Sequence, residues 1–157
     1  MNNLSIRKAK LSDAKSLLLI RNQKHVRNKS INTELIQFSQ HIKWYKKFLD
    51  NSNNYIFLLE VNLKYSENII IGYCRYNLAR NIYYLSIGID KRFLNQGYGS
   101  YFLQKTLKLV KTRKIPIKAK IKKNNIISLK IFQKNNFSIF RSNSFYYYLV
   151  VNSLVHN

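Results

Sequence analysis

The chain of 157 residues carries 28 Lys and Arg but 6 Asp and Glu, a formal net charge of +22. Its length suits one domain, residues 1–157, and an apolar content of 46% indicates a folded protein. The single cysteine, Cys74, excludes a disulfide framework and a cysteine-based zinc cluster, so we expect a buried thiol and no metal. No segment approaches the roughly 18 apolar residues of a membrane span, and the first residues lack the apolar core of a signal peptide. We therefore expect a cytoplasmic protein that does not bind a membrane.

The high positive charge has two interpretations. An anionic partner such as nucleic acid, a membrane surface or a phosphate-rich ligand would select for it. A composition rich in Lys, Asn, Ile and Tyr, typical of an AT-rich genome, would produce it without any partner. The lysines are spread along the whole chain and form no dense basic block, which favours the second interpretation. The charge favours anions but does not name one.

Hydrophobic periodicity predicts alternating strands and helices, with Ser12 placed to cap the first helix. The order β-α-α-β-β-β-α-β-α-β-β indicates an α/β (α+β) sandwich whose sheet is mostly antiparallel and contains one β-α-β crossover. We expect about seven strands, at residues 4–10, 55–62, 68–79, 82–90, 115–122 and in a hairpin over 137–151. We expect about four helices, at residues 13–26, 34–50, 99–112 and 126–134. The predicted apolar face of helix 34–50 is Leu35, Phe38, Ile42, Tyr45 and Leu49.

The segment GIDKRFLNQGYGS, residues 88–100, places Gly97 and Gly99 at the point where a strand and a short loop lead into a helix. A helix N-terminus exposes unpaired backbone N–H groups and the positive end of the helix dipole. Without β-carbons, the backbone there can come within hydrogen-bonding distance of a phosphate. The alternative is a plain strand-to-helix turn with glycines for close packing. A lone G-x-G does not decide between the two.

A second motif follows the next predicted strand, in KNNIISLKIFQKNNF, residues 123–137. Together with LNQGYG, residues 94–99, it resembles the GNAT-type acetyl-CoA-dependent N-acetyltransferases. The first motif resembles the family's R/Q-x-x-G-x-G/A loop, with Leu94 in place of the leading Arg or Gln. The second matches the family at Asn125, Ser128, Lys134 and Phe137, and departs from it at Phe132 and Asn136, where the family usually has Tyr and Gly. The element order fits as well, so the resemblance covers nearly the whole chain.

The resemblance implies a GNAT-like sandwich with acetyl-CoA as co-substrate. The loop cradles the coenzyme pyrophosphate, and pantetheine pairs with the strand SIGID like an added strand. A backbone amide near Ile87 or Ile89 then polarises the thioester carbonyl. Because backbone amides hold the pyrophosphate, Leu94 should cost little, and Asn136 tolerates a left-handed helix end. The residues predicted to bind acetyl-CoA are Ile87, Gly88, Ile89, Leu94, Asn95, Gln96, Gly97, Tyr98, Gly99, Ser100, Asn125 and Ser128.

The acid and base of the reaction are less clearly marked. The family's Tyr often protonates the departing thiolate, which Phe132 cannot do, so Ser128 is the nearest replacement in the sequence; the alternative is a plain surface hydroxyl. No glutamate lies on the strand 82–90, where the family often has one. Asp90 is expected beside the phosphate loop, too far along the strand to accept a proton. A base acting through water, with Ser86, His41 or Glu34 in the relay, remains, and no single base is assigned.

The acceptor is indicated by an R-N…V-R…N…H-x-x-W run that includes Arg21, Asn22, His41 and Trp44. This run resembles the branch that acetylates the 4-amino group of a UDP-linked sugar in pseudaminic acid synthesis, and less closely the ribosomal-protein and polyamine branches. The resemblance implies that these four residues bind a UDP-amino-sugar, which is attacked directly in a ternary complex. The alternative is that Trp44 is core and His41 a polar edge residue.

Other functions stay open at this stage. One is acetylation of a ribosomal protein or another peptide, and another is a non-enzymatic basic RNA-binding module. Nucleic-acid modules gather basic and aromatic residues on one platform, whereas most aromatics here fall at expected core positions, so we do not expect a nucleic-acid partner. A homodimer is left open.

Overall fold

The computed structural model describes residues 3–63, 66–110 and 114–152; the other residues of the predicted domain 1–157 lie outside the description. Its strands form one seven-stranded sheet in the order β1-β2-β3-β4-β5-β7-β6. The strands are β1 (Asn3–Lys8), β2 (Tyr55–Asn62), β3 (Ile69–Ala79), β4 (Ile82–Ile89), β5 (Ile117–Lys122), β6 (Ser138–Ser142) and β7 (Tyr146–Val151). The helices are α1 (Ala14–Arg21), α2 (Lys24–Lys29), α3 (Phe38–Asp50), α4 (Tyr98–Val110) and α5 (Ile126–Lys134), with 3-10 turns η1 (Leu11–Asp13) and η2 (Lys91–Phe93).

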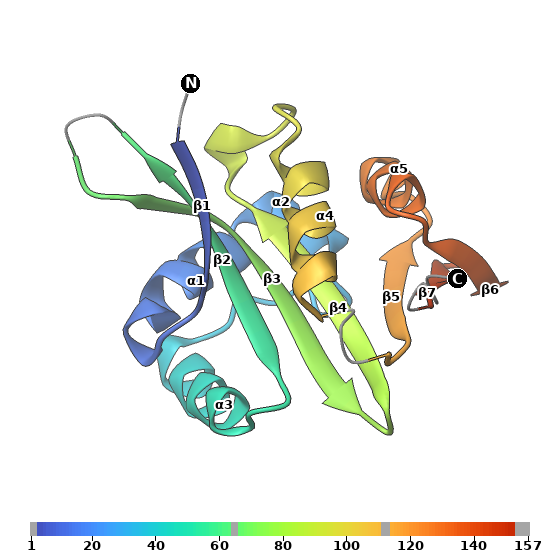
Figure 1. The fold of residues 1–157 in the computed structure, drawn as a ribbon, viewed down its shortest axis with the longest axis horizontal. Helices are drawn as coiled ribbons and strands as arrows, with labels where there is room; N and C mark the ends of the chain where they lie inside the picture. The colour runs from blue at the N-terminus through green and yellow to red at the C-terminus, as the bar shows by residue number, and fades with distance from the viewer. Residues whose placement is uncertain (1–2, 64–65, 111–113, 153–157) are drawn as a thin grey trace.

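Helices cover both faces of the sheet (Figure 1). One core cluster joins the sheet to α4 and α5, with Phe102, Leu103 and Phe132 among its buried residues. The other joins the opposite face to α1 and α3, with Leu17 and Tyr45 among its members. The predicted α/β sandwich is therefore confirmed. No helix of the described residues is long and apolar enough to cross a membrane.

The sheet is antiparallel except between β4 and β5, which are parallel. Helix α4 makes the crossover between these two strands, as predicted from the sequence. Their pairing is limited to Tyr83 with Ile117 and Tyr84 with Lys118. Beyond these pairs β4 continues to Ile89 without β5 at its side, so the sheet is split along this line.

The predicted helix 13–26 is wrong in its continuity. It consists of η1, α1 and α2, with a break at Asn22 and Gln23. Ser12 does not cap α1, because it lies inside η1; instead the Asp13 carboxylate accepts a hydrogen bond from the Lys10 amide at 2.7 Å.

The predicted helix 34–50 begins later, at Phe38. Tyr45 is buried as expected, but Leu35 and Phe38 are 59% and 49% exposed, so the predicted apolar face is wrong at its N-terminal end. Smaller differences concern strand ends: β1 stops at Lys8 and β5 starts at Ile117. The last residues of the predicted helix 99–112 lie outside the described residues. The expected buried thiol is confirmed, since Cys74 is fully buried and burial raises its pKa to about 12.

Arg7 ties the first strand to the start of α1. Its guanidinium binds Asp13 through two hydrogen bonds, of 2.8 and 2.9 Å, and Glu60 on β2 through a third of 2.7 Å. The Arg7 guanidinium lowers the pKa of Asp13 below its ordinary value, and the Lys10 amide adds to this. The ion pair is largely shielded on its acidic side, because the Asp13 side chain is 10% exposed.

Asp13→Asn should lower the free energy of unfolding at pH 7 by about 2 kcal/mol, because hydrogen bonds to charged groups contribute roughly 1.5–3 kcal/mol. Folding lowers the pKa of Asp13, so its stabilisation is present above the ordinary carboxyl pKa and is lost as the pH falls toward the lowered value. Denaturant titrations should therefore show a difference between wild type and variant that shrinks on acidification through the ordinary carboxyl pKa. A difference that stays constant with pH would contradict this assignment.

Candidate active site

The split in the sheet leaves one edge of β4 free. The Tyr83 amide donates to the Pro116 carbonyl on the β5 side at 2.9 Å, whereas the Asp90 amide donates to Ile71 of β3 at 2.8 Å. Because backbone groups alternate between the two edges of a strand, the amides and carbonyls of Ile87 and Ile89 face the split, whereas the Leu85 amide still belongs to the pairing with β5. These are the positions at which the sequence predicts main-chain pairing with pantetheine. The free edge fits that prediction.

The loop after β4 leads to a second set of unpaired donors, at the start of α4. Tyr101 makes the first helical bond, from its amide to the Gly97 carbonyl at 3.1 Å, so the amides of Tyr98, Gly99 and Ser100 lie ahead of the helical ladder. Gly97 has a φ of +79°, and a β-carbon added there would meet no atom within 4 Å. The exposed loop residues Leu94, Asn95 and Gln96 precede it, with Asn95 also left-handed. This arrangement is open and fits an anion.

Gly99 has a different role from Gly97. A β-carbon at Gly99 would lie 3.4 Å from Ile131 and 3.8 Å from Ile89, which are ordinary contacts. A β-carbon would therefore fit at Gly99, between α4, α5 and β4, whereas Gly97 leaves open space in front of the helix.

Asp90 lies at the base of the loop, as expected. Its carboxylate accepts hydrogen bonds from the Arg92 amide at 2.9 Å and from the Arg92 side chain at 3.0 and 3.1 Å. Arg92 lowers the pKa of Asp90, which keeps the carboxylate charged and paired. Asp90 is thus a structural residue of the loop and its charge is balanced locally, which leaves the donors of α4 available for a phosphate.

The second motif forms the start of α5. Asn125 caps this helix, its Oδ1 accepting from the Ser128 amide at 3.3 Å. Ser128 lies one turn before Ile131, on the face that contacts Gly99, so it is near the coenzyme loop. Phe132 is 3% exposed and lies inside the core, with its ring centre 4.9 Å from that of Phe137. Asn136 has a φ of +66°, the left-handed helix end predicted for it.

On the opposite face, side chains from α1, α3 and β3 gather behind β4. Arg75 of β3 is paired across the sheet with Ser86, and its guanidinium lies 5.3 Å from the centre of the Trp44 ring. Tyr73 crosses over Gly88, where a β-carbon would come within 2.6 Å of its ring. Burial lowers the pKa of Arg75, and the neighbouring charge of Arg21 lowers it further.

Two guanidinium nitrogens of this cluster are buried without a hydrogen-bond partner among the described residues, Arg21 Nη1 and Arg75 Nε. The other terminal nitrogen of Arg21, Nη2, donates a hydrogen bond to the Asn32 carbonyl at 2.8 Å. A buried charged donor that lacks a partner destabilises the fold, so such a group indicates a place where a ligand completes the site. The sequence analysis singled out Arg21 but missed Arg75, whose signal is a single arginine in the apolar strand IIIGYCRYNLA.

Asn22 and Arg27, from the predicted acceptor run, hold the loop before α3 in place through hydrogen bonds. Asn22 donates to and accepts from the backbone of Ile36, at 2.9 and 3.0 Å, so its side-chain amide is already used. Arg27 donates to the carbonyls of Asn22 and Thr33. These contacts give Asn22 a structural role, which does not support the predicted contact with a substrate.

His41 and Trp44 differ in their exposure. His41 is 3% exposed, donates Nε2–H to the Ala14 carbonyl at 2.9 Å and stacks on Tyr45. Burial lowers its pKa, which favours a neutral ring held between α1 and α3. This setting favours the structural alternative over a relay or substrate role. Trp44 is 37% exposed and presents part of its ring beside Arg75.

The other two candidates for the proton relay differ in exposure as well. Glu34 is exposed in the loop before α3, and Ser86 is half-buried on β4.

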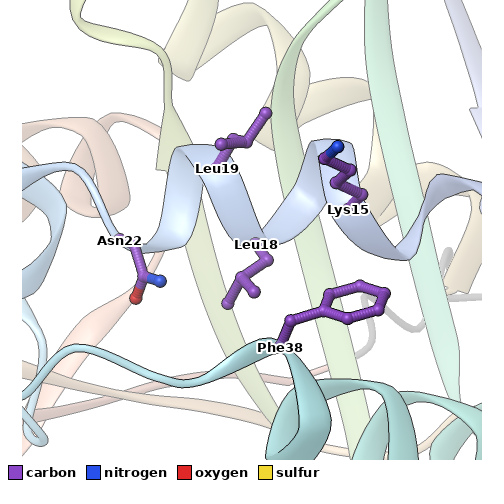
Figure 2. A pocket seen from close by; sticks show the side chains of 5 residues that line it. All are labelled: Lys15, Leu18, Leu19, Asn22 and Phe38. Carbon is purple, nitrogen blue, oxygen red and sulfur yellow. The ribbon is translucent and has the colours of Figure 1, made fainter.

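A shallow hollow of about 420 Å³ lies between α1 and the start of α3 (Figure 2). Lys15, Leu18, Leu19, Asn22 and Phe38 line it. Its lining is mostly apolar, and the open edge of β4 does not contribute to it. The exposed Phe38 thus forms a wall of this hollow, whereas the sequence predicted it in the core.

The open strand edge and the helix N-terminus behind it fit an acyltransferase that uses a coenzyme A thioester. Residues 3–138 match the family described as acetyltransferase (GNAT) domain, and the chain belongs to that family. It is an acetyl-CoA-dependent N-acetyltransferase, so the non-enzymatic alternative is dropped. No protein among the curated sequences matches the chain significantly.

Solved structures share the fold at low sequence identity. A domain from Methanocaldococcus jannaschii is 18% identical with a TM-score of 0.82, and the match covers 97% of this chain and 99% of that domain. The Salmonella typhimurium protein yncA, solved with its cofactor acetyl-CoA, is 14% identical with a TM-score of 0.81, covering 99% and 96%. A spermidine N-acetyltransferase from Vibrio cholerae, in complex with CoA and spermine, is 13% identical with a TM-score of 0.80, covering 96% and 95%.

Gly97→Asp should raise the dissociation constant of acetyl-CoA at least about tenfold, because a carboxylate within several ångströms of a phosphate costs more than 1 kcal/mol even near a protein surface. Asn tolerates the same left-handed backbone without the charge, so Gly97→Asn is the matched control and should bind several times better than the Asp variant. Calorimetric titration measures both. Equal affinities in two folded variants would mean that the coenzyme phosphates do not approach Gly97.

Proposed function

We propose that the protein transfers acetyl from acetyl-CoA to the 4-amino group of a UDP-linked 4-amino-4,6-dideoxy sugar. The amine attacks the thioester directly in a ternary complex. One observation carries the acceptor class: Arg21 Nη1 and Arg75 Nε are buried donors without hydrogen-bond partners among the described residues. The diphosphate of a nucleotide-sugar would supply the acceptor oxygens that these cations lack.

The position of the arginines supports this assignment. Arg75 is paired with Ser86, and Tyr73 of the same cluster lies over Gly88, so the cluster borders the strand that offers its free edge to the coenzyme. An acceptor anchored by its anionic part would extend its amine toward that strand. The amides of Ile87 and Ile89, which face the split, are the donors that would polarise the thioester carbonyl.

Trp44 and the net charge favour a nucleotide-sugar over other amines. The indole is partly exposed beside Arg75, where a uracil or sugar ring could pack on it. A polyamine is a polycation, and it would meet both a formal charge of +22 and two guanidinium groups that each bury one nitrogen without a hydrogen-bond partner among the described residues. A ribosomal-protein N-terminus is the remaining alternative, and nothing in the arginine cluster favours it.

Acetylation assays with a UDP-4-amino-sugar, a ribosomal-protein N-terminal peptide and spermidine test the acceptor class. The UDP-sugar should be acetylated with the highest kcat/KM. Efficient acetylation of the peptide, with every UDP-amino-sugar ignored, would contradict the proposal.

Arg75→Met should raise the KM for the UDP-sugar about 10- to 100-fold, because a hydrogen bond to a charged group contributes roughly 1.5–3 kcal/mol. The KM for acetyl-CoA should change little, since the arginine lies on the other face from α4. Arg141→Met is the control, because Arg141 is an exposed arginine on β6. Steady-state kinetics separate the two constants. A variant that loses acetyl-CoA affinity and keeps the acceptor KM would contradict this role for Arg75.

A further inference from the structure

The carboxylates of the chain do not supply a base at the open edge of β4. Asp13 and Glu60 are bound to Arg7, and Asp90 is bound to Arg92. The other three, Glu34, Asp50 and Glu67, are exposed in or beside loops outside the split. A group that accepts the proton of the attacking amine has therefore to be of another type.

His25 of α2 is such a group, and it lies at the split. Its Nε2 is 2.8 Å from the carbonyl oxygen of Ile89, the last residue of β4. A carbonyl oxygen can only accept, so Nε2 carries the hydrogen and the lone pair of a neutral ring is on Nδ1. Nδ1 has no hydrogen-bond partner among the described residues. The tautomer is thus set by the strand itself, with the basic nitrogen left free.

Helix α2 is held across the split at both ends. Toward β4, the Gln23 Oε1 accepts from the Lys91 amide at 2.8 Å. Toward β5, Lys122 Nζ donates to the Asn28 carbonyl at 2.9 Å, and Lys29 Nζ donates to the Asn124 carbonyl at 3.0 Å. The break between α1 and α2 allows this placement. His25 therefore occupies a fixed position at the free edge of β4.

We propose that His25 is the general base of the acetyl transfer. Nδ1 takes one proton from the acceptor ammonium, which leaves a neutral amine. The amine nitrogen then forms a bond to the thioester carbon, the carbon–sulfur bond breaks, and its electron pair leaves on sulfur. The second proton of the amine goes to the thiolate, and His25 returns its proton to water.

This role is compatible with coenzyme pairing at the same residue. A carbonyl oxygen has two lone pairs, so Ile89 can accept from His25 and from a pantetheine amide together. The charged groups on the elements packed against α2 are Arg21, Asp90, Lys91, Arg92 and Lys122, and those on α2 itself are Lys24, Arg27 and Lys29. The proposal rests on the acetyltransferase activity of the family and not on the UDP-sugar as acceptor.

His25→Gln tests the proposal, because glutamine can still donate to the Ile89 carbonyl but cannot accept a proton. With whichever amine of the acceptor panel the wild type acetylates, kcat should fall about 100-fold, in the usual range for general-base catalysis. The acidic limb of the pH profile of kcat/KM, which reports a group that must be deprotonated, should disappear. The dissociation constant of acetyl-CoA should be unchanged.

Gln23→Ala is the matched control, since it removes the neighbouring contact of α2 with η2 and leaves the histidine in place. It should keep the acidic limb. A His25→Gln variant with wild-type kcat and an intact acidic limb overturns the proposal, and so does a Gln23→Ala variant that reproduces the full loss. Independently of activity, nitrogen-15 spectra of the histidine ring should show a hydrogen on Nε2 and a bare Nδ1; the opposite tautomer also overturns it. If no UDP-sugar is acetylated but His25→Gln loses the limb with another amine, the acceptor proposal alone fails.

Discussion

The early divergence of β4 from β5 is the constraint on which the site depends. Two residue pairs hold the strands together, and beyond them β4 keeps one edge paired with β3 and the other open. An open edge inside a sheet would normally be a liability, because unpaired N–H and C=O groups favour association. Here it faces the start of α4, where further unpaired amides follow. The free donors of strand and helix make a continuous surface for one extended anionic ligand.

The two faces of the sheet carry the two proposed halves of the site. The face with α4 and α5 carries the glycine loop and the capped start of α5. The face with α1, α2 and α3 carries the arginine cluster and His25, and helix α2 links the ends of β4 and β5. Carboxylates are few, and three of them are bound to arginines, while Arg21 and Arg75 on this face each bury one nitrogen without a hydrogen-bond partner among the described residues. Two of the chain's positive charges, those of Arg21 and Arg75, thus lie in one cluster on this face.

Much of the fold could be predicted from the sequence, because a run of apolar, β-branched and aromatic residues marks β2 and a helical pattern marks α5. The break between α1 and α2 could not, since it depends on contacts of Gln23 and His25 with residues more than 60 positions away. Leu35 and Phe38 fit a helical face, but the hydrogen bonds of the Asn22 side chain to the backbone of Ile36 hold that segment outside the core. The coenzyme loop could be predicted from local motifs, whereas the roles proposed for Arg75 and His25 depend on neighbours that only the tertiary structure brings together.

Residue-resolved amide exchange with and without acetyl-CoA is the most direct test of the open edge. Binding should slow exchange at Ile87 and Ile89, and at Tyr98, Gly99 and Ser100, because these amides face the split or precede the helical ladder. Ser86 and Gly88 should change little, since their amides face β3 in either state. Protection that covers Ser86 and Gly88 as strongly as Ile87 and Ile89, or that spares Ile87 and Ile89, would contradict a coenzyme site built on the split.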